Sequence, residues 1–342
     1  MKVKRAPAAD GTLIRDLAAV LAGEARDFSR HATADTWAAV RWHGIYSLIH
    51  AAAREGLVSG ISEDLATALR RYARGFAIMD DAFRRQTERL LAAFSGADLP
   101  CLVIKGQAIA VLYYDHPRLR HRVDVDVLIP ERRRTEAIDV LEHEGYLLQG
   151  HDRTRLTTAQ FVATAPGPSP QPVKFDVHLQ ASNRAVFGAV LEFEAAWERR
   201  QALPGPGASA WAPDTIDLIL HSCAHRLAHG RNAARERLLW LFDIQQMAAT
   251  LSDEERQRLV ELARARNVGG ICGDALRVAR DLFGSPYDAA WIEALEAQRK
   301  EEPSWALARS GKLAWYWSDL RGQRGAGDKL TYLKETLLNQ LR

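Results

Sequence analysis

The sequence has few cysteines, no long apolar run and little net charge, and each shortage excludes a class of protein. Cys101, Cys223 and Cys272 are odd in number and far apart, which predicts reduced thiols in a cytoplasmic protein. No stretch approaches the roughly 18 apolar residues of a membrane span, and Arg15 and Asp16 interrupt the apolar part of the N-terminus. We therefore expect neither a signal peptide nor a membrane partner. A net charge of +3 gives no strong electrostatic reason to expect nucleic acid as a partner.

What the chain does contain is an ordinary globular composition, with 47% hydrophobic and 26% charged residues. Apolar residues recur at helical spacing up to residue 97, and the last of these segments runs from about Glu63 to Ala97. Helical patterns return after Pro204-Gly205-Pro206-Gly207, a sequence typical of a boundary. We expect a helical region over 1–97, a domain with strands over 98–203 and a helical domain over 204–342.

The residues that suggest chemistry gather near the start of the middle domain. Cys101–Ile104 is a short apolar run that predicts a buried strand. Lys105-Gly106 interrupts this run, and Gln107–Tyr114 is typical of a short helix. The sequence therefore predicts a strand, a tight turn and a helix in succession.

The next strand carries two carboxylates on one face. Val123–Ile129 alternates, so that Asp124 and Asp126 point to the side opposite Val123, Val125 and Val127. Like charges a few ångströms apart raise the pKa of one of the two groups. An oxygen-ligated divalent ion such as Mg²⁺ removes that cost, so the pattern indicates a shared cation.

This glycine turn, helix and D-x-D strand resembles the nucleotidyltransferase superfamily, which has the polymerase β-like fold. The longer motif is similar, in order and spacing, to that of a branch of uncharacterised bacterial nucleotidyltransferases. It consists here of Lys105-Gly106, Tyr113, His116-Pro117, Arg120, Asp124, Asp126, Leu128 and Gly145-Tyr146. The resemblance implies an α+β fold, with a small mixed β-sheet as the nucleotidyltransferase core and helical domains at both ends.

The resemblance also implies a third carboxylate, supplied by a strand with the pattern D-x-H. Asp176-Val177-His178 matches it, within the alternating run Val173–Leu179. Asp124, Asp126 and Asp176 would hold two Mg²⁺ ions for phosphoryl transfer from an NTP, with Asp176 also a candidate base for the acceptor hydroxyl. His178 is expected to be a hydrogen-bond partner and not a metal ligand.

Five residues are expected to contact the nucleotide. In the superfamily, backbone amides after the glycine hold phosphates at a helix N-terminus, which assigns that role to Lys105, Gly106 and Gln107. Gln107 stands where a serine or glycine is usual, so the hydroxyl is missing while the amide remains. Lys105 has the alternative of pairing with a carboxylate of the sheet. Arg120 suits a triphosphate because its fork binds oxygens bidentately, and Asp243 is expected near the base, ribose or metal.

Several positions keep a structural alternative. The basic run 115–122 could be a solvated face, and Arg122 shares strand parity with Asp124 and Asp126 and could pair with them. Asp243 could form an ion pair with Arg235, Arg237 or a histidine. His221, His225 and His229 lie on one face of a helix that Asp214 is expected to cap. They lack a nearby carboxylate or cysteine that would complete a zinc site, which favours a cleft wall or a helical interface.

The function that follows is Mg²⁺-dependent transfer of an NMP group from an NTP to an unidentified small-molecule, peptide or protein acceptor. Three alternatives remain open from the sequence. The first is a catalytically degenerate module that binds nucleotide or protein. The second is a toxin-like enzyme that modifies tRNA or protein. The third is a helical scaffold without nucleotide binding.

Overall fold

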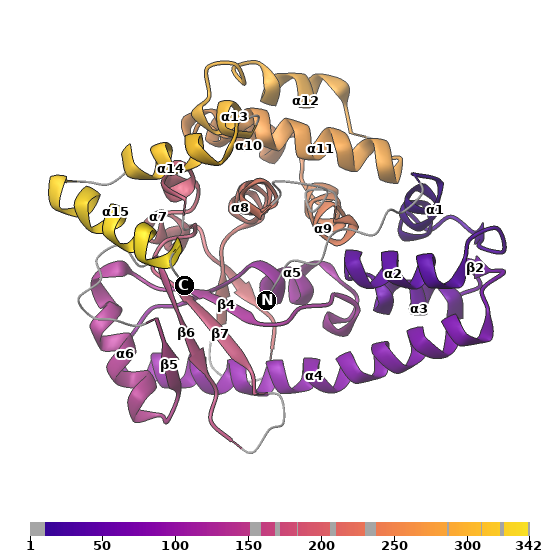
Figure 1. Ribbon diagram of the computed structural model, residues 1–342, viewed down its shortest axis with the longest axis horizontal. Coiled ribbons are helices and arrows are strands. Elements are labelled where there is room, and N and C mark those ends of the chain that lie inside the picture. The colour runs from indigo at the N-terminus through magenta and orange to yellow at the C-terminus, as the bar shows by residue number, and fades with distance from the viewer. Residues whose placement is uncertain are drawn as a thin grey trace.

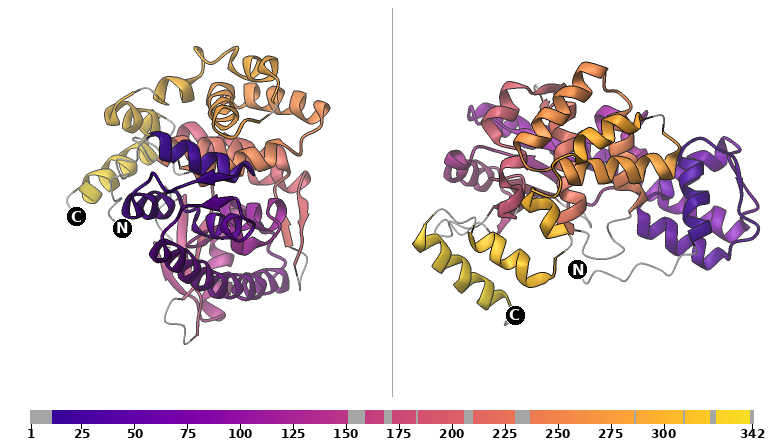
Figure 2. Two further views of the ribbon diagram at one scale, coloured as in Figure 1. Left: turned by 90° about the vertical axis from the view of Figure 1, so that its right-hand side faces the viewer. Right: turned by 90° about the horizontal axis from the view of Figure 1, so that it is seen from above.

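The computed structural model describes residues 11–150, 159–167, 172–182, 184–205, 210–229, 237–285, 287–308, 310–321 and 325–340. A long helix, α4 (Glu63–Gly96), runs along one side of a small sheet, and C-terminal helices gather on the opposite side (Figure 1). The first and last helices lie at opposite ends of the molecule (Figure 2). Within the described residues, no helix combines the length and apolar character that a membrane crossing needs.

The N-terminal part is helical, as the apolar spacing predicts. It consists of α1 (Gly11–Leu21), α2 (Thr33–His43), α3 (Tyr46–Arg54) and α4, with β1 (Arg26–Asp27) and β2 (Val58–Ser59) paired in parallel between them. Ser62 caps helix α4, because its side chain accepts a hydrogen bond from the Leu65 amide. Its buried residues recur at helical spacing along one face, which packs this 34-residue helix against the rest of the protein.

The sheet has the strand order β3-β4-β7-β6-β5. Its strands are β3 (Leu102–Ile104), β4 (Val125–Leu128), β5 (Leu147–Gln149), β6 (Gln160–Thr164) and β7 (Lys174–His178). The central pair β4 and β7 is parallel and the other pairs are antiparallel, so the sheet is mixed. The observed fold class is α+β, as expected.

Strand β4 is shorter than the alternation predicts. Its pairing with β3 begins at Asp126 and its pairing with β7 at Val125, so Val123 has no strand partner. Val123 is 68% exposed, and its predicted place on the inward face of the strand is wrong. The residue before it, Arg122, is bound to Asp80 of α4 and to the Pro117 carbonyl and not to the sheet, which is consistent with a strand that begins only at Val125.

Short helices connect and cover these strands. They are α5 (Lys105–Tyr113), η1 (Pro117–Leu119), η2 (Glu131–Arg133), α6 (Arg134–His143), η3 (Ala185–Val190) and α7 (Phe193–Glu198). Gly145 ends the helical segment at φ +81°, a left-handed conformation that favours glycine. The predicted loop 166–172 falls in large part outside the described residues.

The Pro-Gly segment at 204–207 connects two paired strands. These are β8 (Gln201–Leu203) and β9 (Ala210–Ala212), which are antiparallel, so the segment joins a hairpin. Helix α8 (Thr215–His229) follows, and Asp214 caps it by accepting a hydrogen bond from the Asp217 amide at 2.8 Å, as predicted. The remaining helices are α9 (Leu238–Ala248), α10 (Asp253–Ala265), α11 (Gly269–Phe283), α12 (Ala289–Glu296), α13 (Pro303–Ala308), α14 (Lys312–Arg321) and α15 (Ala326–Gln340).

A buried carboxylate joins the start of α8 to its neighbours. Asp217 is fully buried and pairs with Arg199, after α7, and with Arg266, after α10, at 2.7 Å each. Replacing Asp217 with alanine would leave the buried end of Arg266 without its counter-charge and Arg199 with only Asp214, at 3.6 Å. We expect it to lower the free energy of unfolding by about 3–5 kcal/mol, measured by urea denaturation.

The matched control is Asp281→Ala. Asp281 is 62% exposed and pairs with Arg280 at the surface. Its loss should cost less than about 1 kcal/mol. Equal losses in the two variants would contradict the structural role of Asp217.

Candidate functional site

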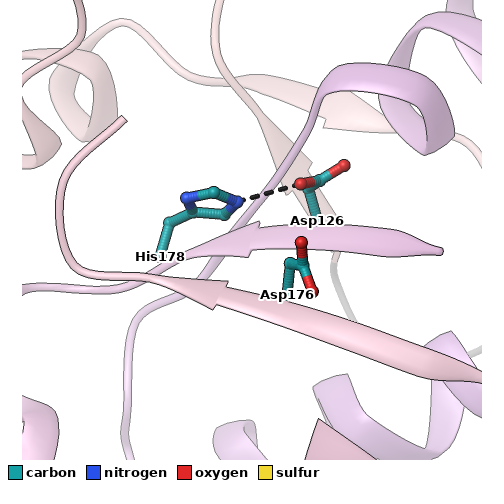
Figure 3. Close-up of side chains that lie close together, drawn as sticks. All are labelled: Asp126, Asp176 and His178. Atoms are coloured by element: carbon teal, nitrogen blue, oxygen red, sulfur yellow. Dashed lines mark hydrogen bonds and ion pairs between the residues drawn. The ribbon is translucent and has the colours of Figure 1, made fainter. Parts of the chain in front are cut away.

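Parallel pairing brings two of the predicted carboxylates together. Asp126 of β4 lies directly opposite Asp176 of β7 in the register of the sheet. Both side chains project from the same face of the two strands (Figure 3). One ligand atom from each of Asp126, Asp176 and His178 lies within 4.8 Å of the others, which is close enough for a shared metal ion.

A lysine ammonium contacts the same group. Lys105 Nζ lies 2.6 Å from Asp126 Oδ1 and 3.0 Å from His178 Nε2. Lys105 opens α5 directly after β3 and adopts φ +51°, an uncommon conformation for a residue other than glycine. The sequence left Lys105 two roles, a phosphate contact or a carboxylate pair, and the structure contains the pair.

His178 makes the hydrogen bond to a carboxylate that the sequence predicted. Its Nε2 lies 2.9 Å from Asp126 Oδ1, and its Nδ1 is buried without a partner in the described structure. Burial, and next the Lys105 charge, lower the pKa of His178 and favour the neutral ring. The Nε2 atom of a neutral histidine can also bind a metal ion. The position of His178, close to Asp126 and Asp176, is therefore compatible with a metal ligand as well as with the hydrogen-bond role that the sequence predicted.

The carboxylates affect one another strongly. Burial, and next the charges of Asp126 and Asp176, raise the pKa of Asp124 to about 7. Burial opposes ionisation of Asp126 too, but the Lys105 ammonium and the His178 hydrogen bond outweigh it and hold the Asp126 pKa well below its usual range. Burial and the Asp126 charge raise the pKa of Asp176. This excess of negative charge favours binding of a further cation.

These side chains form the floor of a cavity of about 740 Å³. Lys105, Gly106, Asp124 and the sheet residues line one part, and α8, α9 and the C-terminal helices line the rest. A volume of this size lies within the usual range for small-molecule sites. Gln107 is buried and is not among the described residues that line the cavity, so its nucleotide contact stays a prediction.

Two predicted nucleotide contacts prove to be partners of each other. Arg120 Nε lies 3.0 Å from Asp243 Oδ1 and Arg120 Nη2 lies 2.6 Å from Asp243 Oδ2, a buried bidentate pair. Tyr114 donates a further hydrogen bond to Asp243 at 2.7 Å. Arg120 is thus the partner of Asp243, in place of the expected Arg237 or a histidine. Arg235 lies outside the described residues.

The glycine of the turn makes room for this pair. A Cβ atom on Gly106 would lie 2.6 Å from Arg120 Nη1. The close approach of Arg120 therefore excludes any larger residue unless the guanidinium moves. Arg120 and Asp243 both line the cavity, and a contact of either with nucleotide stays a prediction.

Arg122 does not pair with the aspartates, and that expectation is wrong. Its guanidinium pairs with Asp80 of α4 and lies over the rings of Phe76 and Phe83. Because β4 begins only at Val125, strand parity does not extend to Arg122. The basic loop is therefore fixed to α4 at this residue, and it is not a solvated charge run there.

The three histidines of α8 line the cavity, so the cleft wall is confirmed as one of the two places that the sequence predicted for them. His221 Nε2 lies 3.0 Å from the Ala181 carbonyl, to which it can donate. The rings of His225 and His229 contact each other and Trp240 of α9. Burial lowers the pKa of all three, to about 3 for His221, so they are neutral near pH 7.

Comparison with known proteins places the chain in a family. Residues 32–284 match the pattern of a family described as uncharacterised nucleotidyltransferases. The chain belongs to this family. No curated protein matches the sequence.

Two solved structures are similar to this nucleotidyltransferase at low identity. The antibiotic-resistance factor ANT(2'')-Ia is 17% identical with a TM-score of 0.40, covering 55% of this chain and 94% of that one. An antigenic nucleotidyltransferase-like protein from Paracoccidioides brasiliensis is 12% identical with a TM-score of 0.36, covering 62% of this chain and 96% of that one. Likenesses at these TM-scores assign no activity and no substrate.

The donor set of this family member fits a divalent cation. Asp126 and Asp176 supply oxygen ligands, the choice of Mg²⁺, and their charges exceed the single charge of Lys105 beside them. Sequence reasoning missed Arg184 and Arg237 as cavity residues. Asp319 and Tyr332, beyond the family match, also line the cavity. Neither pair belongs to a motif that could have revealed it.

The raised pKa of Asp124 predicts a pH effect on the metal-free protein. The folded-state pKa of about 7 exceeds the ordinary value of 3.8, so the folded state binds the proton more tightly. The stabilisation from Asp124 is complete below pH 3.8 and is lost as pH rises to about 7. Melting temperatures measured in chelator from pH 4 to 8 should show this fall, and Asp124→Asn should reduce it.

The control for this measurement is Asp115→Asn, which removes an exposed carboxylate from the neighbouring loop. Its pH profile should follow that of the wild type. A profile for Asp124→Asn that is parallel to the wild type across the whole range would contradict the assigned pKa shift.

Proposed function

We propose that this nucleotidyltransferase moves an NMP group from an NTP to an acceptor, with divalent metal bound at Asp124, Asp126 and Asp176. The observation that supports the proposal most is the direct register of Asp126 and Asp176 on adjacent parallel strands, with Asp124 two residues away. A scaffold would gain nothing from close carboxylates at the floor of a cavity, because their repulsion costs stability. The same arrangement is useful where cations and phosphates meet.

Each side chain has a defined task under this proposal. Asp126 and Asp176 bind the cation, and Asp124, once deprotonated, adds its charge to theirs. His178 orients Asp126 through the hydrogen bond at 2.9 Å. Bound Mg²⁺ would neutralise charge on the phosphates and on the attacking and leaving oxygens, as in two-metal phosphoryl transfer.

The transfer itself needs a nucleophile and a proton acceptor. An oxygen of the acceptor would bond to the α-phosphorus of the NTP as the bond to the β-phosphate oxygen breaks and pyrophosphate leaves. The proton of the acceptor hydroxyl would pass to Asp176, whose raised pKa suits a base better than that of Asp126 does. The acceptor binds in the remainder of the cavity.

The first test is Asp126→Asn. It keeps the shape of the side chain and removes the charge that pairs with Lys105. We expect Mg²⁺-dependent NTP binding, measured by calorimetry with each of the four NTPs, to fall by at least about a hundredfold, and transfer to be abolished. The fold should persist by circular dichroism.

Asp115→Asn serves again as the control and should bind NTP like the wild type. Full Mg²⁺-dependent binding by Asp126→Asn would overturn the metal assignment. If the wild type bound NTP normally but formed no product with any acceptor supplied, a module that only binds nucleotide would be favoured.

The second test addresses Lys105. Its ammonium contacts Asp126 Oδ1 and His178 Nε2, atoms that belong to the group able to hold a metal. Lys105→Met removes this competing cation. We expect Mn²⁺ to bind the nucleotide-free variant about tenfold more tightly than the wild type, measured by calorimetry.

The control is Lys174→Met on β7. Lys174 is exposed and its charge also acts to lower the pKa of Asp176, but it makes no contact with Asp126 in the described structure. A small gain in Mn²⁺ affinity is expected there. Equal gains in both variants would show that Lys105 acts by general electrostatics and not by occupying the ligand atoms.

A further inference from the structure

The cations that line the cavity are not equally available to a ligand. They are Lys105, Arg120, Arg122, Arg184 and Arg237. The first four each pair with an aspartate, namely Asp126, Asp243, Asp80 and Asp319 respectively. The guanidinium of Arg237 has neither an ion pair nor a hydrogen bond with any residue that the structure describes.

Arg237 is nevertheless held in place. Its guanidinium carbon lies 5.1 Å from the ring centroid of Trp42, in α2, and 5.1 Å from that of Trp240, in α9. Contacts with two indoles position a cation without neutralising its charge. The Nε atom is buried without a hydrogen-bond partner, and burial lowers the pKa of the guanidinium, so its charge is poorly solvated.

The imidazoles around Arg237 in the described part of the chain are neutral near pH 7. His43 accepts a hydrogen bond from the Leu238 amide at 3.1 Å through Nδ1, which requires the neutral ring. After burial, the Arg237 charge lowers the pKa of His43, and it also contributes, after burial and the charges of Arg120 and Arg122, to the lowered pKa of His121. His225 and His229, beside Trp240, make no hydrogen bond with described residues and could donate to a ligand. Among the residues that the structure describes, no carboxylate pairs with Arg237.

We propose that Arg237, with the imidazoles of His225 and His229, forms a subsite of the cavity for a phosphate group. The planar guanidinium binds phosphate oxygens bidentately, and neutral imidazoles donate further hydrogen bonds. The phosphate belongs either to the triphosphate of the NTP or to a phosphorylated acceptor. This inference rests on the proposed function for those two sources, but the site itself can be tested without metal and without turnover.

The experiment compares Arg237→Gln and Arg237→Met with the wild type, at a temperature where circular dichroism shows all three folded. Inorganic tripolyphosphate is titrated by calorimetry in chelator, and then ATP and the other NTPs are titrated with Mg²⁺. We expect both variants to bind tripolyphosphate about tenfold to a hundredfold more weakly, as befits the loss of a charge-assisted pair. Arg118→Gln is the matched control, because Arg118 is exposed in the nearby loop and does not line the described cavity.

A further titration separates the two sources. Wild type and variants saturated with Mg²⁺ and a non-hydrolysable NTP are titrated with inorganic phosphate. Weakened NTP binding in the variants assigns Arg237 to the donor. Unchanged NTP binding with loss of the additional phosphate assigns it to the acceptor.

Either of these results supports the phosphate subsite. The inference is overturned if the Arg237 variants match Arg118→Gln in every titration. Asp126→Asn separates a failure of this inference from a failure of the proposed function. Tripolyphosphate binding in chelator does not require the metal, so this variant should lose metal-dependent NTP binding and keep tripolyphosphate binding. Loss of metal-dependent binding in Asp126→Asn, with no effect of Arg237, would leave the proposed function standing alone.

Discussion

The rest of the site depends on the parallel pairing of β4 with β7, because this pairing places Asp126 and Asp176 side by side. Backbone hydrogen bonds fix this register, so the two carboxylates cannot separate without breaking the centre of the sheet. Their repulsion has to be met by charge from elsewhere. Lys105 supplies part of it from the turn after β3, at the expense of an uncommon backbone conformation. The charge that remains uncompensated is what suits the floor of the cavity to a divalent cation.

Around this floor, most arginines have structural partners. Arg120 joins the loop before β4 to α9 through Asp243, and Arg122 joins the same loop to α4 through Asp80. Tyr46 of α3 adds a hydrogen bond to His121, between these two arginines. The loop that leads into β4 is therefore fixed from both sides, by the N-terminal helices and by α9. Such rigid support is what a phosphoryl-transfer site needs, since most of its rate enhancement comes from positioning and electrostatics.

The sequence predicted the local features well and the distant contacts poorly. The resemblance, and not the spacing, led us to expect that Asp126 and Asp176 would lie close together. Alternation within 123–129 and 173–179 indicated the faces of β4 and β7. Helical spacing gave α4 to within one residue of its observed end. These successes share a cause, because strand and helix periods depend on neighbours in sequence. By contrast, Arg120 and Asp243 are 123 residues apart, and nothing in local spacing could show that two expected nucleotide contacts bind each other. The prediction for Val123 failed beside another distant contact, because the preceding Arg122 pairs with Asp80 of α4, 42 residues away, and β4 begins only at Val125.

The construction of the cavity bears on where acceptor recognition can arise. Under the proposed function, the carboxylate floor would act on phosphates and cations, which are common to any nucleotidyl transfer, so it would not distinguish acceptors. Distinction requires side chains from the walls. These come from α8 and α9, and also from Asp319 of α14 and Tyr332 of α15, which lie beyond the residues that match the family. Asp319 is tied to Arg184 at 2.6 Å, and Arg184 in turn lies over the ring of Trp315. The last helices thus shape one wall of the cavity through a charge pair with the segment that follows β7, and a change in them alters that wall while leaving the carboxylates in place.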